Sequence, residues 1–483
     1  MSDESSRSAV EPDLAIQTNG SRNGETRSGD RAETPSIVRV LMASGTARLI
    51  VLPITGISTL VIARLITGSV GIEQFGAVML IATLGQLLMF ADLGAGAAVA
   101  SATAQMDGSS EQLEHFRRTL LTAIRTVFWS AAVLAVGAVT VGLFADWPSL
   151  LGIRPPENEG ILSANLATVI ALVVFCVTLP FALGEAVQRG AGRLHHAVLL
   201  TGLAAPTALT FTLILRSLGA PTFAYALVMP FGALLGTACC AIGARRTLRS
   251  TLAGLSRQVF HPRRFRGLPI LGTAGPMFIV MVGLPLALQT DRIIIAHRVD
   301  AASLSDYTYA VQLYTPLWSV VSVAALGLWP LFAAKGTEIA SMRQSWLKAV
   351  TLLGGVGLSF AAAFLLLAGI IIGWMSGGSA TPEFGLILSF AALLAVQAAH
   401  VGTGIMLISP KHLRFQAICV IALVLTNVPL SWLLAPVLGA TGPVVASVIT
   451  VAICQLLPGV LAARRATSTS LVLARNAAGK VPA

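Results

Sequence analysis

Long apolar stretches recur along this chain of 483 residues and constrain its fold more than any other feature. About 20 consecutive apolar residues are enough for a helix to cross a membrane. Charged residues make up only 11% of the chain, against about 25% in an ordinary soluble domain. We therefore predict an all-α polytopic membrane protein. We place its twelve transmembrane helices at residues 39–66, 75–103, 118–144, 161–184, 194–217, 221–243, 268–295, 307–333, 346–374, 384–408, 414–437 and 441–463.

The connections between these spans carry most of the basic residues, and they alternate in charge. Arginine and lysine gather in the connections on the side of the N-terminus, whereas the opposite connections hold more acidic residues. Short basic connections stay in the cytoplasm. We therefore expect a multi-pass protein of the cell (inner) membrane with both termini cytoplasmic. The net charge of +11 is explained in this way and does not indicate a nucleic-acid partner.

The composition also divides the chain into segments. Residues 1–36 are polar and predict a disordered cytoplasmic tail. Residues 244–267 place leucines at helical spacing among arginines, which is typical of an amphipathic helix on an anionic membrane surface, with a specific lipid site as the alternative. This linker separates two pseudo-symmetric six-helix bundles, 37–243 and 268–463, and residues 464–483 form a second cytoplasmic tail.

One apolar span contains a carboxylate. Residues 75–105 read FGAVMLIATLGQLLMFADLGAGAAVASATAQ, and we expect one continuous helix there. A charge within the membrane is costly and normally faces the protein interior or a water-filled cavity. We therefore expect Asp92 either to line a polar path or to hold two helices together. Arg48 lies at a similar depth in the preceding span, so we hypothesise an ion pair that lines a central cavity. Four residues would share one face of the helix: Gly85, Asp92, Gly96 and Val99.

Several classes of protein are disfavoured by what the sequence lacks. It has no glycine-rich phosphate-binding loop with lysine, which argues against ATP hydrolysis. The connections opposite the N-terminus are short and contain no cluster of catalytic residues. The five cysteines lie within apolar spans and show no metal-binding spacing. We therefore expect neither an enzyme nor a protein that needs a cofactor or a metal.

Short motifs in both halves resemble the polysaccharide-export (O-antigen and exopolysaccharide) flippases of the multidrug/oligosaccharidyl-lipid/polysaccharide exporter superfamily. The resemblance extends over residues 37–463. Asp92 and Asp291 match its signature positions directly. The motifs are Phe75-Gly76, Ala91-Asp92-Leu93-Gly94, the run from Gln289 to Ile295, Pro330-Leu331-Phe332, and the run from Leu438 to Pro443.

The resemblance implies an alternating-access transporter that flips undecaprenyl-diphosphate-linked oligosaccharide for surface polysaccharides, including lipopolysaccharide. It implies that the lipid-linked oligosaccharide and membrane lipids are ligands, and that a polysaccharide polymerase and a chain-length regulator are partners. A cationic cavity suits a diphosphate, so the candidate translocation-path residues are Arg48, Arg64, Asp92, Arg125, Asp291 and Arg292. The alternatives are a peptidoglycan-precursor flippase, a cation-coupled drug exporter, a membrane glycosyltransferase or ligase, and an assembly scaffold.

Overall fold

The secondary structure of the described part of the chain is helical, without strands. The expected N-terminal tail, most of the basic linker and the motif Pro330–Phe332 lie outside the described residues. The computed structural model describes residues 37–106, 109–156, 162–248, 258–259, 261, 275–326, 328, 339–407 and 410–478.

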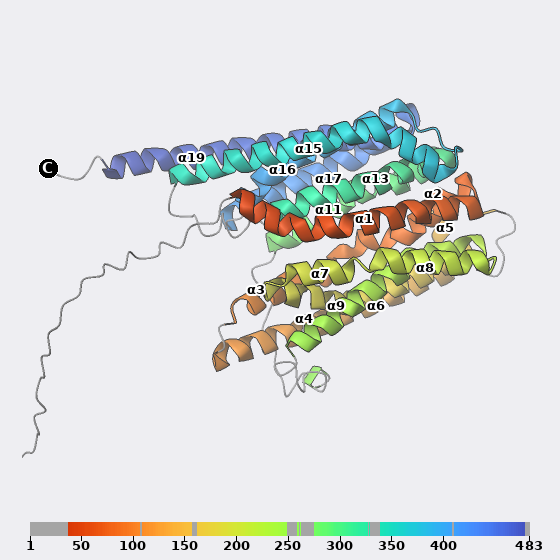
Figure 1. Ribbon diagram of the computed structural model, residues 1–483, viewed down its shortest axis with the longest axis horizontal. Coiled ribbons are helices and arrows are strands. Elements are labelled where there is room, and N and C mark those ends of the chain that lie inside the picture. Colours follow the sequence, from red (N-terminus) through yellow and green to blue (C-terminus); the bar gives the residue numbers. More distant parts are fainter. Residues whose placement is uncertain are drawn as a thin grey trace, which may run out of the picture. The chain divides into compact units, whose positions relative to one another are not determined.

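The helices run side by side (Figure 1). Before the linker they are α1 (Ile37–Val70), α2 (Ile72–Thr83), η1 (Leu84–Asp92), α3 (Ala95–Ala104), α4 (Ser110–Phe144), α5 (Trp147–Leu151), α6 (Ala164–Gly190), α7 (Leu194–Thr201), α8 (Ala204–Ser217), η2 (Thr222–Leu227) and α9 (Val228–Thr247). After the linker they are α11 (Gly275–Gln289), α12 (Asp291–Arg298), α13 (Ala301–Leu326), α15 (Ile339–Ser376), α16 (Phe384–Met406), α17 (Pro410–Leu438), α18 (Thr441–Val451), η3 (Ala452–Leu456) and α19 (Leu457–Ala478).

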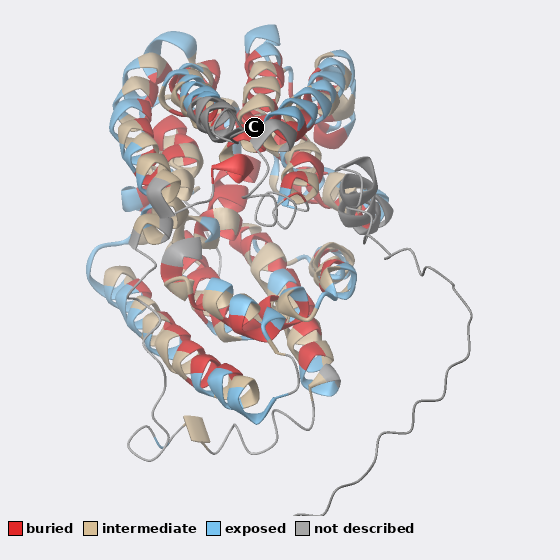
Figure 2. Ribbon diagram, turned by 90° about the vertical axis from the view of Figure 1, so that its left-hand side faces the viewer, coloured by how far each residue is buried: buried red, intermediate tan, exposed pale blue. Residues whose placement is uncertain are grey.

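Eleven helical segments of the described chain are long and apolar enough to cross a membrane. They correspond to every expected span except the second. Their outward faces carry large apolar side chains such as Phe144, Leu366 and Val437, which are 84%, 75% and 76% exposed. Figure 2 shows exposed residues on the outer faces of the helices and buried residues where helices meet. A lipid environment accounts for this pattern, because apolar side chains that face lipid avoid the unfavourable free energy of exposure to water.

The second expected span is not a continuous helix, so that prediction was wrong. The chain passes from α2 through the 3₁₀ segment η1 and then starts α3. Leu93 and Gly94 between them have φ angles of +50° and +78°. A left-handed pair interrupts the helical hydrogen-bond ladder, and glycine adopts that conformation without steric cost. Gly85 and Asp92 therefore do not share a helical face with Gly96 and Val99.

The halves before and after the linker meet where α1 and α2 pack against α13. Gly76 donates its backbone N–H to Ser305 Oγ over 2.9 Å, and the same hydroxyl donates to the carbonyl of Ile72 over 2.5 Å. A Cβ on Gly76 would lie 2.8 Å from the backbone nitrogen of Ser305. Only glycine therefore allows α2 and α13 to approach this closely.

A second contact lies beside it on the same helices. The hydroxyl groups of Tyr309 and Thr67 are 2.5 Å apart and hydrogen-bonded. The Tyr309 ring stacks on Phe75, with ring centroids 4.3 Å apart. Both aromatic side chains are fully buried. The two halves are thus joined at this end of the helices by buried, specific contacts.

Candidate functional site

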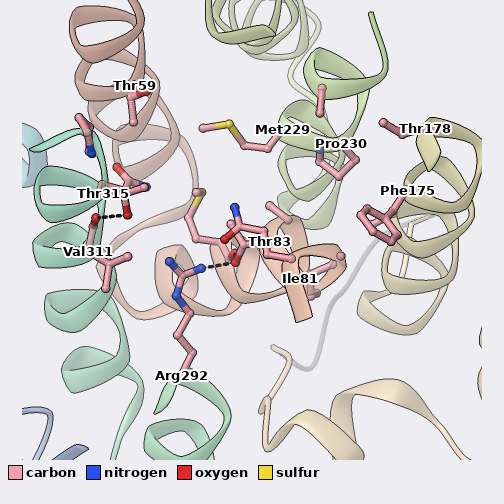
Figure 3. A pocket seen from close by; sticks show the side chains of 18 residues that line it. Thr59, Ile81, Thr83, Phe175, Thr178, Met229, Pro230, Arg292, Val311 and Thr315 are labelled. Carbon is pink, nitrogen blue, oxygen red and sulfur yellow. Dashed lines mark hydrogen bonds between the residues drawn. The ribbon is translucent and has the colours of Figure 1, made fainter. Parts of the chain in front are cut away.

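A cavity of about 380 Å³ lies between helices of the two halves. The first half contributes α1, α2, η1, α6 and α9, and the second half contributes α12 and α13 (Figure 3). Gly85 permits this arrangement, because a Cβ there would lie 2.5 Å from the Phe175 ring. The lining residues are Thr59, Met79, Ile81, Ala82, Thr83, Gly85, Gln86, Ala171, Phe175, Thr178, Met229, Pro230, Ala233, Arg292, Val311, Gln312, Thr315 and Pro316.

Arg292 supplies the positive charge of this cavity. Its side chain extends from α12 toward α2, where Nη1 donates a hydrogen bond to Thr83 Oγ1 (Figure 3). The residue is only 6% exposed, and its Nε is buried without a hydrogen-bond partner among the described residues. Among the described side chains, no carboxylate forms an ion pair with it. A buried, unneutralised guanidinium favours an anion nearby.

Gln312 adds an uncharged polar group from α13. It lines the same cavity and is 8% exposed. Its Oε1 and Nε2 are both buried without a partner in the described part of the chain. Leaving such groups unsatisfied costs about 1–3 kcal/mol each. A ligand with hydrogen-bonding oxygen atoms would satisfy Gln312 and Arg292 together.

Asp291 precedes Arg292 and points to another part of the fold. Its Oδ1 accepts a hydrogen bond from Ser431 Oγ on α17, and its Oδ2 accepts one from Ser447 Oγ on α18, each over 3.3 Å. Asn427 joins this cluster by donating from Nδ2 to Ser447 Oγ over 3.2 Å. The side chains of adjacent residues on a helix point to different faces. Asp291 therefore holds the second half together, whereas Arg292 reaches the cavity. The cluster offers carboxylate, hydroxyl and amide oxygens, which hard cations and protons bind.

Asp92 lies at the break between η1 and α3. Its Oδ1 accepts a hydrogen bond from the N–H of Gly94 over 2.9 Å, and its Oδ2 accepts one from the N–H of Gly96 over 3.3 Å. These are backbone groups at the start of α3, which have no partner within that helix. The half-buried carboxylate thus stabilises the start of α3. The hypothesised pair with Arg48 stays a prediction, because the Arg48 side chain lies outside the described residues.

The other two candidate arginines bind backbone carbonyls away from the cavity. Arg64 donates from Nη1 to the carbonyl of Trp374 over 2.5 Å, and its guanidinium carbon lies 5.6 Å from the centre of that indole. Arg125 donates from Nε to the carbonyl of Val259 over 2.9 Å and from Nη2 to that of Gln258 over 2.6 Å. Arg64 therefore joins α1 to α15, and Arg125 attaches the linker to α4. Their roles in translocation stay predictions.

Several residues of these sites could not be found from the sequence. Thr83, Ser431 and Ser447 are small polar residues in apolar helices, and such residues usually bond within their own helix. Only their positions relative to Arg292 and Asp291 reveal a role. Among the described residues, no cluster of three or more histidine, cysteine, aspartate or glutamate side chains is arranged to hold a metal ion.

A family profile described as "Polysaccharide biosynthesis protein" matches residues 43–334. No curated protein matches the chain. An inward-facing multidrug-resistance MATE family transporter of the MOP superfamily superimposes with a TM-score of 0.65 at 14% identity, covering 88% of this chain and 98% of the other.

Two further structures extend the comparison. An outward-facing MATE transporter gives a TM-score of 0.58 at 15% identity, with 90% and 97% of the two chains covered. The lipid II flippase MurJ, in an inward closed conformation, gives 0.52 at 13% identity, with 86% and 87% covered. At these identities the likeness concerns the fold. It confirms the predicted architecture of two six-helix bundles.

Proposed function

The chain belongs to the polysaccharide biosynthesis protein family, and from this premise we propose that it flips undecaprenyl-diphosphate-linked oligosaccharide units across the cell membrane for surface polysaccharide synthesis. The cargo combines an anionic diphosphate with a hydroxyl-rich glycan. A protein that moves it needs a polar cavity inside an apolar bundle and must exchange access between the two membrane sides. The cavity between the two halves, which contains Arg292 and Gln312, supports the first requirement.

The observation that supports this cargo most strongly is the buried guanidinium of Arg292. Charge interactions strengthen as the local dielectric constant falls, and arginine binds phosphate oxygens through two parallel hydrogen bonds. The unpartnered Nε of Arg292 is available for such a bond. We propose that this residue binds the diphosphate, and that Arg48 on α1 is a further residue of the translocation path.

The other candidates take supporting roles in this proposal. Arg64 and Arg125 would act where helices or the linker change position, because both bind backbone carbonyls of distant segments. Asp291 and Asp92 would hold the helices that carry the cavity. The domain boundaries are proposed as 37–243 and 268–463, with 244–267 as an amphipathic linker. Both termini are proposed to be cytoplasmic, in keeping with the distribution of basic residues.

The structural similarity to MATE transporters suggests a cation-coupled drug exporter as the alternative. Organic cations need acidic or aromatic partners. The described residues that line the Arg292 cavity include one aromatic residue, Phe175, and no aspartate or glutamate. A peptidoglycan-precursor flippase is favoured by the likeness to MurJ. Its cargo also carries a diphosphate, so the glycan of the cargo distinguishes these two functions. We propose transport in preference to catalysis or a scaffold role.

The test is flipping in vesicles that contain the purified full-length protein. A lipid-linked oligosaccharide is incorporated, and an enzyme added outside detects the glycans that reach the outer leaflet. We expect Arg292→Gln to slow flipping by about 10- to 100-fold, because a hydrogen bond to a charged group contributes about 1.5–3 kcal/mol. Arg154→Gln is the matched control, because Arg154 is exposed. Equal rates for wild type and Arg292→Gln, or no flipping by folded wild type, would refute the proposal.

A further inference from the structure

The second half of the chain contains another cavity, of about 430 Å³. It lies between α11, α13, α16, α17 and η3. Besides the indole of Trp318, five of its lining residues carry hydrogen-bonding side chains, which are amides or an imidazole: Gln289, Gln397, His400, Gln416 and Gln455. Its described lining includes no lysine, arginine, aspartate or glutamate. The remaining lining is largely apolar, with Trp318 as the aromatic residue.

Two of these polar groups are left without partners. His400 Nδ1 is buried and makes no hydrogen bond to any described residue. The Gln455 side chain is 7% exposed and has no hydrogen bond within the described part of the chain. By contrast, Gln416 donates from Nε2 to the carbonyls of Gly404 and Leu407, over 2.9 and 2.7 Å. His400 and Gln455 are therefore free to bind a ligand, whereas Gln416 holds the wall.

The local backbone presents these groups to the cavity. Gln397 and His400 are three residues apart on α16 and so share one face of that helix. Gln455 lies in η3, a π-helical turn between α18 and α19. Such turns are rare and are frequently found at functional sites. If the α-helix continued without this wider turn, the side-chain amide of Gln455 would occupy a different position.

This cavity and the Arg292 cavity are neighbours. Thr315 and Pro316 of α13 line the Arg292 cavity, and Trp318 lines the second one. Positions 315 and 318 are separated by about 4.5 Å along a helix axis, since each residue rises about 1.5 Å. Gln289 and Arg292 are similarly close in sequence and line the second and the first cavity, respectively. The two cavities therefore use adjacent positions along α13 and on either side of the junction between α11 and α12.

We propose that this second cavity binds the uncharged, hydroxyl-rich glycan of the lipid-linked cargo. Amide and imidazole groups both donate and accept hydrogen bonds, as sugar hydroxyls do. An indole face packs against the apolar face of a sugar ring. A cation or an anion would find no opposite charge among the described lining residues. The inference rests on the proposed function, because it takes the diphosphate at Arg292 as the neighbouring anchor.

The test compares two ligands on the full-length protein in detergent. One is undecaprenyl diphosphate that carries a disaccharide of neutral hexoses, and the other is undecaprenyl diphosphate without sugar. We expect wild type to bind the glycosylated lipid more tightly. His400→Leu and Gln455→Leu should each weaken binding of that lipid by about fivefold, the effect of one net hydrogen bond. Binding of the sugar-free lipid should stay unchanged.

Both variants should keep or raise the melting temperature, because they replace unpartnered polar groups by apolar ones. His195→Leu, on the exposed part of α7, is the matched control. The inference is overturned if the disaccharide adds no affinity in wild type, or if the added affinity survives in both folded variants. Arg292→Gln tests the proposed function separately, because it should weaken binding of both lipids by the same factor.

Discussion

Gly76→Ala should separate the two halves at the contact between α2 and α13. The new methyl group would lie 2.8 Å from the backbone nitrogen and from Oγ of Ser305, and 2.9 Å from Leu304 Cγ. Backbone cannot yield as a flexible side chain does, so the helices must move apart. Overpacking of this kind costs about 1–3 kcal/mol.

The movement also affects the bridge through Ser305. Its hydroxyl accepts a hydrogen bond from Gly76 and donates one to Ile72, and each contributes about 0.5–1.5 kcal/mol. The substitution therefore destabilises the conformation in which α2 and α13 touch by about 2 kcal/mol in total. This lowers the population of that conformation relative to the others by about 30-fold. The alternative conformation would then dominate if its free energy lies within about 1 kcal/mol of the first.

The measurement is the distance between spin labels on Ser69 and Ala302, in pulsed electron resonance on the full-length protein in lipid nanodiscs. Both positions are exposed, near the facing ends of α1 and α13. We expect a longer distance to gain population in Gly76→Ala. Gly137→Ala is the matched control, because a Cβ on Gly137 meets no atom within 4 Å. A distance distribution identical to that of wild type would refute the reasoning.

Two further predictions concern arginine and aspartate contacts to backbone groups. Asp92→Ala should lower the free energy of unfolding by about 1 kcal/mol, as loss of a helix cap does. Asp92→Asn should lower it by less, because the asparagine keeps an acceptor for the N–H of Gly94. Equal melting temperatures for wild type and Asp92→Ala would contradict this prediction. Arg125→Gln should speed proteolytic cleavage within residues 244–267 by roughly tenfold, because it removes charge-assisted hydrogen bonds to the linker. The control variant Arg118→Gln should leave the cleavage rate unchanged. Equal cleavage rates in the two variants would show that Arg125 does not restrain the linker.

Part of the candidate site followed from sequence reasoning. Asp291 and Arg292 stand out as adjacent charges in an apolar stretch, and their divergence follows from helical geometry. Their partners did not follow, because Thr83 precedes Arg292 by 209 positions and Ser447 follows Asp291 by 156. Small hydroxyl groups carry no hydropathy signal, so nothing in the sequence marks them as partners.

The second expected span shows the limit of periodicity. A run of apolar helix formers predicts a helix, and α2 and α3 are indeed helical. The break between them depends on Gly94, which tolerates the left-handed conformation, and on Asp92, which binds the freed N–H groups. The sequence indicated both residues, but an aspartate beside glycines is also compatible with a continuous helix.

The sequence by itself determined the class of this protein and eleven of its spans, because a bilayer leaves an apolar stretch of about 20 residues no stable alternative to a helix. Only the tertiary structure decided what each charged residue binds. Arg125 and Arg64 bind backbone carbonyls, and Arg292 alone of the described candidate arginines lines the cavity between the halves. The reason is physical: the bilayer acts on each span separately, whereas the partner of a charge depends on which helices become neighbours and how each is rotated about its axis.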